Sequence, residues 1–161
     1  MIAVGEKPDF NFDITALVAG EEQTQPFASL LSKPTIITVY MRNNTSACDK
    51  QNASLAAGEA AITSKGYQII AVSRDKCTSH AKYAQKLGIA YTLVADPEDR
   101  VATALDAVIE KSMYGKKYMG PARAAFLLNA SGTVEAIIPK LNPKEHAEEL
   151  LALIDSLHTT S

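Results

Sequence analysis

The stretch that most restricts the fold is residues 35–72, in which two apolar segments enclose one long helical segment. Thr35–Tyr40 is a short apolar and β-branched run, which is typical of a strand buried in the middle of a sheet. Arg42–Asn44 has the composition of a turn, and the Ala-rich residues up to Lys65 predict a helix. Tyr67–Val72 predicts a second buried strand. This order of elements indicates the α/β class.

The remaining residues continue this alternation and then end in an antiparallel hairpin and an amphipathic helix. The expected elements are an extended arm over residues 1–14, a hairpin turn at Gly20–Glu22, a helical turn at Phe27–Leu31, helices at Lys76–Leu87 and Asp99–Leu105, a strand at Thr92–Ala95, a basic loop at Lys111–Pro121, hairpin strands at Arg123–Leu128 and Thr133–Ile138, and a helix from Pro143. We therefore expect a three-layer α/β/α sandwich with a central mixed sheet, formed by one domain over residues 1–161.

Composition excludes several classes of protein. With a formal net charge of −2, the chain lacks the basic surface of a dedicated nucleic-acid binder. No apolar run reaches the length of a membrane span, and the first residues lack the basic and apolar regions of a signal peptide. The two cysteines do not make a disulfide scaffold, so they indicate thiols in a reducing compartment and a cytoplasmic location. His80, His146 and His158 lack a metal-binding spacing, so we expect no metal and place them at the surface or at helix ends.

Cys48 is the residue that points to chemistry, because it lies in the first turn of the helix that leaves the first buried strand. Thr45 or Ser46 precedes it and can cap that helix through a side-chain oxygen. Unpaired backbone N–H groups and the positive end of the helix dipole favour an anion at this place. A thiol at this position therefore tends to ionise.

The stabilisation that a thiolate requires is larger than a helix end supplies. A thiol with a pKa near 8.5 is only about 3% ionised at pH 7. Lowering the pKa to about 6 would ionise about 90% of it and requires about 3.4 kcal/mol of differential stabilisation. A helix end contributes about 0.3–1 kcal/mol, and about 2 kcal/mol when it is partly buried. A second cation or hydrogen-bond donor must therefore act on Cys48.

Several motifs together resemble the peroxiredoxins, and most of all their Q type, also called bacterioferritin comigratory protein. The resemblance covers nearly the whole chain. The Thr-x-x-Cys motif alone would be weak evidence, whereas its combination with the Met-Tyr-Gly-Lys segment and the arginine is specific. The motifs are Asn44-Thr45-x-x-Cys48, Val72-Ser73-Arg74-Asp75-x-x-x-Ser79-His80, Met113-Tyr114-Gly115-Lys116-x-Tyr118-Met119-Gly120 and Arg123-x-x-Phe126-Leu127, with the late Gly132.

The resemblance implies a thioredoxin-like fold and a peroxidase that reduces hydrogen peroxide or alkyl hydroperoxides without metal, haem or flavin. It implies that Cys48 is the peroxidatic cysteine, whose thiolate is oxidised to a sulfenic acid. Thr45 matches the threonine that orients the thiolate and the peroxide, and Arg123 matches the arginine beside the sulfur. Arg123 would then be the second cation that the ionisation of Cys48 requires.

Tyr40, Met41 and Ala47 are the residues that we expect to contact the peroxide. Met41 occupies the position of the family's motif proline, which normally shields the pocket, and Gln51 occupies that of an acidic residue. Methionine is apolar and could still shield the pocket, but it is flexible and oxidisable. These departures predict a weakened peroxidase activity.

Cys77 is the other cysteine and a candidate resolving cysteine. The positions at which Q-type members carry the resolving residue are Ala53 and Ala84 in this chain. Cys77 begins the neighbouring helix, so the two thiols could meet after the first turns unwind, since neighbouring strands lie about 5 Å apart. Alternatively, Cys77 is a bystander, and a small-molecule thiol or a partner protein resolves Cys48.

Two functions remain open from the sequence. The first is a thiol peroxidase that acts as a monomer or weak dimer on a hydroperoxide and is reduced by thioredoxin or a similar thiol. The second is a catalytically impaired redox sensor or interaction protein, which Met41 and the missing standard resolving cysteine favour. A disulfide exchanger of thioredoxin type would need a Cys-x-x-Cys, which the sequence lacks.

Overall fold

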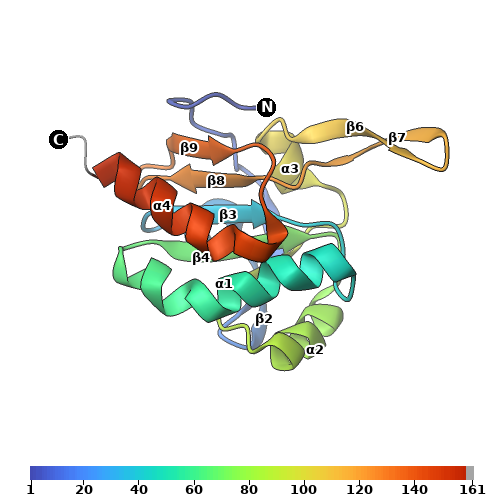
Figure 1. The fold of residues 1–161 in the computed structure, drawn as a ribbon, viewed down its shortest axis with the longest axis horizontal. Coiled ribbons are helices and arrows are strands. Elements are labelled where there is room, and N and C mark those ends of the chain that lie inside the picture. Colours follow the sequence, from blue (N-terminus) through green and yellow to red (C-terminus); the bar gives the residue numbers. More distant parts are fainter. Residues whose placement is uncertain (159–161) are drawn as a thin grey trace.

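The computed structural model describes residues 1–158, and a seven-stranded sheet forms its centre (Figure 1). The strand order is β2-β1-β5-β4-β3-β8-β9. β4 pairs in parallel with both β3 and β5, and the other neighbours are antiparallel, which confirms the predicted mixed sheet. The strands are β1 (Asp13–Val18), β2 (Glu21–Pro26), β3 (Thr35–Val39), β4 (Gln68–Ser73), β5 (Thr92–Ala95), β8 (Ala125–Leu128) and β9 (Val134–Ile138).

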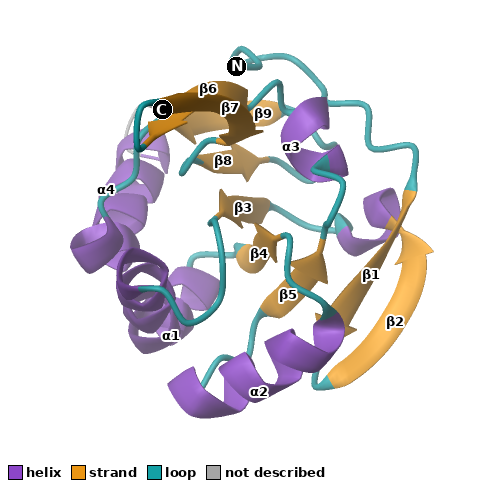
Figure 2. Cartoon of the chain, turned by 90° about the vertical axis from the view of Figure 1, so that its right-hand side faces the viewer, coloured by secondary structure: helices purple, strands orange, loops and turns teal. Residues whose placement is uncertain are grey.

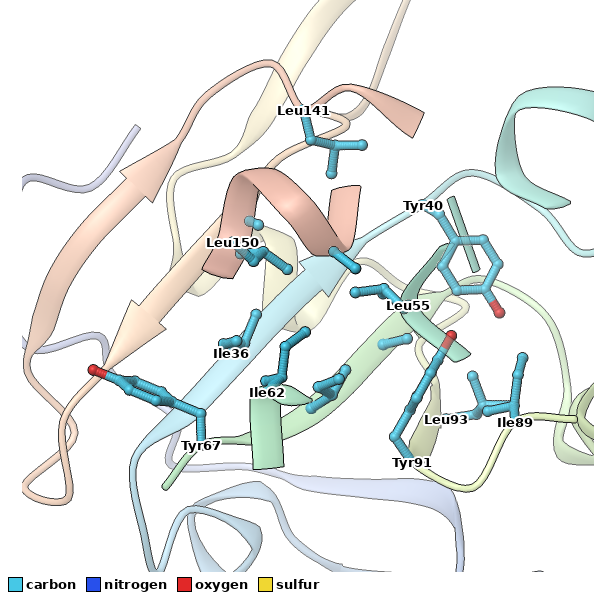
Figure 3. Packing of buried hydrophobic residues seen from close by; sticks show 14 of the residues in the cluster. Ile36, Tyr40, Leu55, Ile62, Tyr67, Ile89, Tyr91, Leu93, Leu141 and Leu150 are labelled. Atoms are coloured by element: carbon cyan, nitrogen blue, oxygen red, sulfur yellow. The ribbon is translucent and has the colours of Figure 1, made fainter. Parts of the chain in front are cut away.

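Two hydrophobic clusters cover opposite faces of this sheet, because successive residues of a strand point to opposite sides. In β3, Ile36 belongs to one cluster and Ile37 to the other. The first cluster contains side chains of α1 (Ser46–Ser64), α2 (Cys77–Leu87) and α4 (His146–His158), and the second those of α3 (Arg100–Ala104) and the 3-10 helix η1 (Phe27–Leu30). Figure 2 shows helices on both sides of the sheet, and Figure 3 shows part of the first cluster. The three-layer α/β/α sandwich that the sequence predicts is confirmed.

The helices end or begin near the residues that the sequence predicts. α1 ends at Ser64 and is followed by Gly66, and α2 is followed by Gly88 in the left-handed conformation. α4 follows a short 3-10 helix, η2 (Pro143–Glu145), so Pro143 starts the last helical segment. Within residues 1–158, no helix is both long and apolar enough to pass through a lipid bilayer.

Residues 111–121 correct one sequence-based expectation, because they do not form a loop. They belong to a hairpin of β6 (Val108–Met113) and β7 (Lys116–Pro121), which makes a separate two-stranded sheet and projects from the rest of the fold (Figure 1). Tyr114 and Gly115 make the two-residue turn with positive φ angles of 52° and 78°, as a tight hairpin requires. Most side chains of these strands are exposed, so no buried apolar alternation marks them in the sequence.

Gly58 allows α1 and α4 to pack closely. A Cβ atom at this position would lie 2.5 Å from Cβ of Ala147 in α4. Alanine is ordinarily better than glycine in a helix interior by about 1 kcal/mol. Here we expect Gly58→Ala to lower the free energy of unfolding by about 1–3 kcal/mol, as overpacking usually does. Urea denaturation measures the change.

The matched control is Gly58→Ala combined with Ala147→Gly, which removes the opposing methyl group. The double variant should recover most of the lost stability. Equal instability of the single and the double variant would contradict the steric explanation.

Candidate active site

Cys48 lies in the first turn of α1, just beyond the carboxyl end of the central strand β3, as the sequence predicts. Its side chain is completely buried, in the hydrophobic cluster that also contains Tyr40 and Leu55. The sulfur therefore lies at the positive end of a 19-residue helix and away from solvent. Few other places in a fold favour a thiolate electrostatically while also removing its hydration.

Thr45 occupies the N-cap position of α1 but does not cap the helix with its side chain, which corrects the sequence-based expectation. Its hydroxyl donates to the backbone oxygen of Arg42 at 2.9 Å, so it closes the turn before the helix. Ser46 is already the first helical residue. The backbone N–H groups of the first turn are thus left available for an anion.

Arg123 is brought to the sulfur from the segment before β8. Its Nη1 donates to Cys48 Sγ at 3.3 Å and to Gln51 Oε1 at 2.9 Å. Among residues 1–158, the ion pairs of the structure do not include Arg123, so no carboxylate neutralises its charge. The second cation that the pKa argument requires is therefore in contact with the thiol.

The pKa of Cys48 lies below the ordinary value of a thiol, as the net result of opposed effects. Burial raises it. The polar groups around the sulfur lower it, namely the side chain of Thr45, the backbone of Arg42, the Arg123 guanidinium and the backbone of Met41. These groups outweigh the loss of hydration, so the site favours the thiolate.

Lys111 is a site residue whose position the sequence did not reveal. The sequence predicts a basic loop around it, whereas in the structure Lys111 is half-buried on β6 and its Nζ donates to Met41 Sδ at 2.6 Å. Lys116 and Lys117 are exposed. Burial lowers the pKa of Lys111, and the nearby charges of Arg123 and Arg74 lower it further. The β6–β7 hairpin therefore brings a further cation to the entrance of the site.

The loop between β3 and α1 is fixed by a buried polar network around Asn43. The Tyr40 hydroxyl donates to Asn43 Oδ1 at 2.5 Å, and Asn43 Nδ2 lies 3.0 Å from Ser79 Oγ and 3.1 Å from His80 Nδ1. The backbone N–H of Asn43 donates to Asp75 Oδ2 at 2.9 Å. The segments after β3 and β4 that carried the resemblance therefore meet here and hold the loop that leads to the cysteine.

The structure does not bring Cys77 to the same place. Cys77 begins α2 and lines a surface pocket of about 330 Å³ with Thr15 and Glu22 of the β1–β2 hairpin. Burial and the Glu22 carboxylate raise the pKa of Cys77 to about 11. Both cysteines are free thiols in this structure, and they differ sharply in their tendency to ionise.

Sequence reasoning missed a buried polar chain behind Arg123. Gln51 Nε2 donates to Thr38 Oγ1 at 2.9 Å, and Thr38 Oγ1 lies 2.9 Å from His146 Nε2. His146 begins α4, at a helix end as expected, but its side chain is fully buried, as is that of His80. His158 is exposed. A histidine at a helix start gives no local sign of burial, so only the register of β3 against α4 could have revealed the contact.

Within the described range 1–158, no group of three or more histidine, cysteine and acidic side chains could hold a metal ion.

Comparison with known proteins gives a consistent result. A model of the AhpC/TSA family matches residues 5–137 of the chain. Peroxiredoxin Bcp of Xanthomonas campestris pv. campestris is 32% identical over 152 residues, which make up 94% of this chain and 94% of that protein.

Solved structures agree with this match. Peroxiredoxin Q of Xanthomonas campestris superposes with a TM-score of 0.84 and 29% identity, over 96% of this chain and 97% of the other. A structure of bacterioferritin comigratory protein from Xanthomonas campestris, studied for its alkyl peroxide reduction activity, superposes with a TM-score of 0.84 and 28% identity. The match covers 97% of this chain and 99% of the other. The fold is the thioredoxin-like fold of these peroxiredoxins.

Arg123→Met tests the electrostatic role of the arginine. Loss of a hydrogen bond to a charged group costs about 1.5–3 kcal/mol, so we expect a higher pKa of Cys48 and an oxidation by hydrogen peroxide that is about 10- to 100-fold slower. The thiolate absorbance at 240 nm between pH 4 and 8.5 measures the pKa, and stopped-flow fluorescence measures the rate. Arg100→Met, which removes a charge paired with Glu98 on the surface, is the control and should change neither. An unchanged pKa of Cys48 in Arg123→Met would refute the assignment.

The two thiols should also differ in their alkylation profiles. In the native protein, the rate of iodoacetamide modification of Cys48 should level off below the ordinary thiol range, while that of Cys77 should rise until about pH 11. Mass spectrometry of the separate peptides resolves the two rates. In urea both profiles should coincide near a pKa of about 8.5. Coincident profiles in the native protein would contradict the opposite shifts in the pKa values of Cys48 and Cys77.

Proposed function

As a member of the AhpC/TSA family this chain is a thiol-dependent peroxidase of the peroxiredoxin Q type, and we propose that Cys48 is the cysteine that attacks the hydroperoxide. The observation that carries the proposal is the 3.3 Å contact between Arg123 Nη1 and Cys48 Sγ at the start of α1. It places a permanent cation and a helix end on one buried thiol. Cys77 has the opposite environment, with a carboxylate beside it and a raised pKa.

In the proposed reaction the Cys48 thiolate attacks the terminal oxygen of a hydroperoxide, ROOH. The S–O bond forms as the O–O bond breaks, the sulfur gives up two electrons, and the leaving RO⁻ takes up a proton to become ROH. Cys48 is left as a sulfenic acid. Arg123 can stabilise the departing oxygen, because a guanidinium carries further N–H groups beyond those that bind Cys48 and Gln51. The proposed substrates are hydrogen peroxide and alkyl hydroperoxides.

We assign supporting roles to the residues around the sulfur. Thr45 is the residue proposed to orient the thiolate and the peroxide, although in this structure its hydroxyl hydrogen is donated to the backbone oxygen of Arg42. Met41 and Ala47 are half-buried beside the loop and the first turn of α1, where they would contact the incoming peroxide. Tyr40 is buried and its hydroxyl is bound to Asn43, so its contribution would be the wall of the site and not a free donor.

For the return to the thiol, we propose an external thiol such as thioredoxin. The first thiol displaces water from the sulfenic acid and forms a mixed disulfide, and a second thiol of the reductant releases Cys48. Cys77 lies in a separate pocket with a pKa near 11, which disfavours it as the attacking thiolate in the folded state. Resolution by Cys77 would require the first turns of α1 and α2 to unwind, which would disturb the 2.8 Å hydrogen bond from Tyr83 in α2 to Asp49 in the first turn of α1.

A redox sensor is the second candidate function, and the separation of Cys77 from the site favours it. A sensor would be oxidised once per molecule and would not turn over with a thiol reductant. We further propose that the protein acts in the cytoplasm, because both cysteines are free thiols suited to a reducing compartment. As a separate proposal, it acts as a monomer or weak dimer.

A stopped-flow comparison of the wild type, Cys48→Ser and Cys77→Ser tests the proposal. Oxidation of the reduced protein by hydrogen peroxide should be lost in Cys48→Ser and unchanged in Cys77→Ser. With thioredoxin, thioredoxin reductase and NADPH, both the wild type and Cys77→Ser should turn over. A wild-type rate no faster than that of a free thiol would refute the peroxidatic role of Cys48.

Peroxide-treated protein analysed by mass spectrometry without reduction separates the routes of recycling. We expect an oxidised Cys48, or an adduct of it with added thiol, and no peptide that links Cys48 to Cys77. A linked peptide would show that Cys77 resolves within the chain. Rapid single oxidation without turnover by any thiol would support the sensor.

A further inference from the structure

A single chain of hydrogen bonds leads from the proposed catalytic sulfur through the protein to α4. It runs from Cys48 Sγ to Arg123 Nη1 (3.3 Å), Gln51 Oε1 (2.9 Å) and, from Gln51 Nε2, to Thr38 Oγ1 (2.9 Å). Thr38 Oγ1 then lies 2.9 Å from His146 Nε2, and His146 Nδ1 lies 2.8 Å from Glu149 Oε1. The three middle residues, Gln51, Thr38 and His146, are fully buried.

The groups along this chain determine the direction of each of its bonds. The Glu149 carboxylate oxygen accepts from His146 Nδ1, as it does from the backbone N–H of Asn142 at 2.9 Å. Burial lowers the pKa of His146, so the ring is neutral and its Nε2 is an acceptor. The Thr38 hydroxyl therefore donates to His146 and uses its lone pair to accept from Gln51 Nε2.

This polarity fixes the amide of Gln51. Its NH₂ group must face Thr38 and the backbone oxygen of Val39, so its Oε1 must face Arg123. Arg123 Nη1 has two N–H groups, and with one bound to Gln51 Oε1 the other is directed at Cys48 Sγ. A reversed amide would turn donors toward the guanidinium and push it from this position.

We propose that His146 is a positioning residue for the peroxidase reaction, which orients Arg123 toward Cys48 through Thr38 and Gln51. The inference rests on the proposed function of Cys48. His146 touches neither the sulfur nor the peroxide, and its effect depends on the acceptor character of Nε2 and not on its volume. The Glu149 carboxylate holds the tautomer that makes Nε2 an acceptor.

The test compares two substitutions of His146 in a Cys77→Ser protein, which leaves one thiol. In His146→Leu the acceptor is lost, so the Thr38 hydroxyl is free to rotate and no longer presents a fixed lone pair to Gln51 Nε2, which leaves that amide held only by its 3.3 Å bond to the Val39 backbone oxygen. We expect a higher pKa of Cys48 at 240 nm and an oxidation by hydrogen peroxide about tenfold slower. In His146→Gln a carbonyl oxygen can accept from Thr38, so the rate should stay within about threefold of the parent.

Two controls separate positioning from general loosening of α4. Ile154→Val removes a methyl group from the same buried face of α4 and should change neither readout. In a Gln51→Ala background, His146→Leu should have no further effect, because its only route to Arg123 has gone. If His146→Leu does not fold, Thr38→Val breaks the same chain in nearly the same volume and should show the same rise in pKa and the same loss of rate.

Several outcomes would overturn the inference. The first is an unchanged oxidation rate in His146→Leu or Thr38→Val. The second is an equal loss of rate in His146→Leu and His146→Gln. The third is a loss of rate in His146→Leu that adds in full to the loss caused by Gln51→Ala. None of these affects the peroxidatic role of Cys48, which the Cys48→Ser variant tests independently. A parent protein that oxidises no faster than a free thiol would instead refute the proposed function itself.

Discussion

The site depends on lowering the pKa of a thiol from which water is excluded. Cys48 is completely buried, and burial alone raises its pKa. A helix end supplies about 0.3–2 kcal/mol, and a hydrogen bond to a charged group supplies about 1.5–3 kcal/mol. Together they approach the roughly 3.4 kcal/mol that a pKa near 6 requires, and neither reaches it alone. The start of α1 and the guanidinium of Arg123 must therefore meet at one atom, and the pairing of β3 with both β4 and β8 makes that meeting possible.

Gln51 shows how the arginine is held without losing its charge. Arg123 binds a neutral amide oxygen, which positions the guanidinium but does not neutralise it as a carboxylate would. The carboxylate that ends the hydrogen-bond chain, Glu149, is separated from Arg123 by three intervening residues. The charge of Glu149 is thus kept away from the sulfur, although the chain of hydrogen bonds reaches from one to the other. Gln51 therefore leaves the positive charge of Arg123 uncompensated beside Cys48.

Local sequence patterns were sufficient for the elements whose side chains are buried. The apolar run of β3, the turn after it and the glycines after α1 and α2 predicted their boundaries to within a few residues. The β6–β7 hairpin was missed because its exposed strands carry no apolar alternation, and the position of Lys111 was missed with it. The contact of Arg123 with Cys48 spans 75 residues and that of Thr38 with His146 spans 108, so no local pattern encodes either. A family resemblance supplied the first contact, and only the packed structure supplied the second.

Met41 illustrates why a departure from a motif needs a structure to interpret. The expectation of weakened activity rests on the loss of a rigid proline shield, and it stays a prediction. Proline has no backbone N–H, whereas the N–H of Met41 is one of the donors that lower the pKa of Cys48. The thioether of Met41 also accepts from Lys111, which brings a cation from the projecting hairpin to the entrance of the site. The departure from proline therefore exchanges rigidity for a backbone donor, which favours the thiolate on which the proposed chemistry depends.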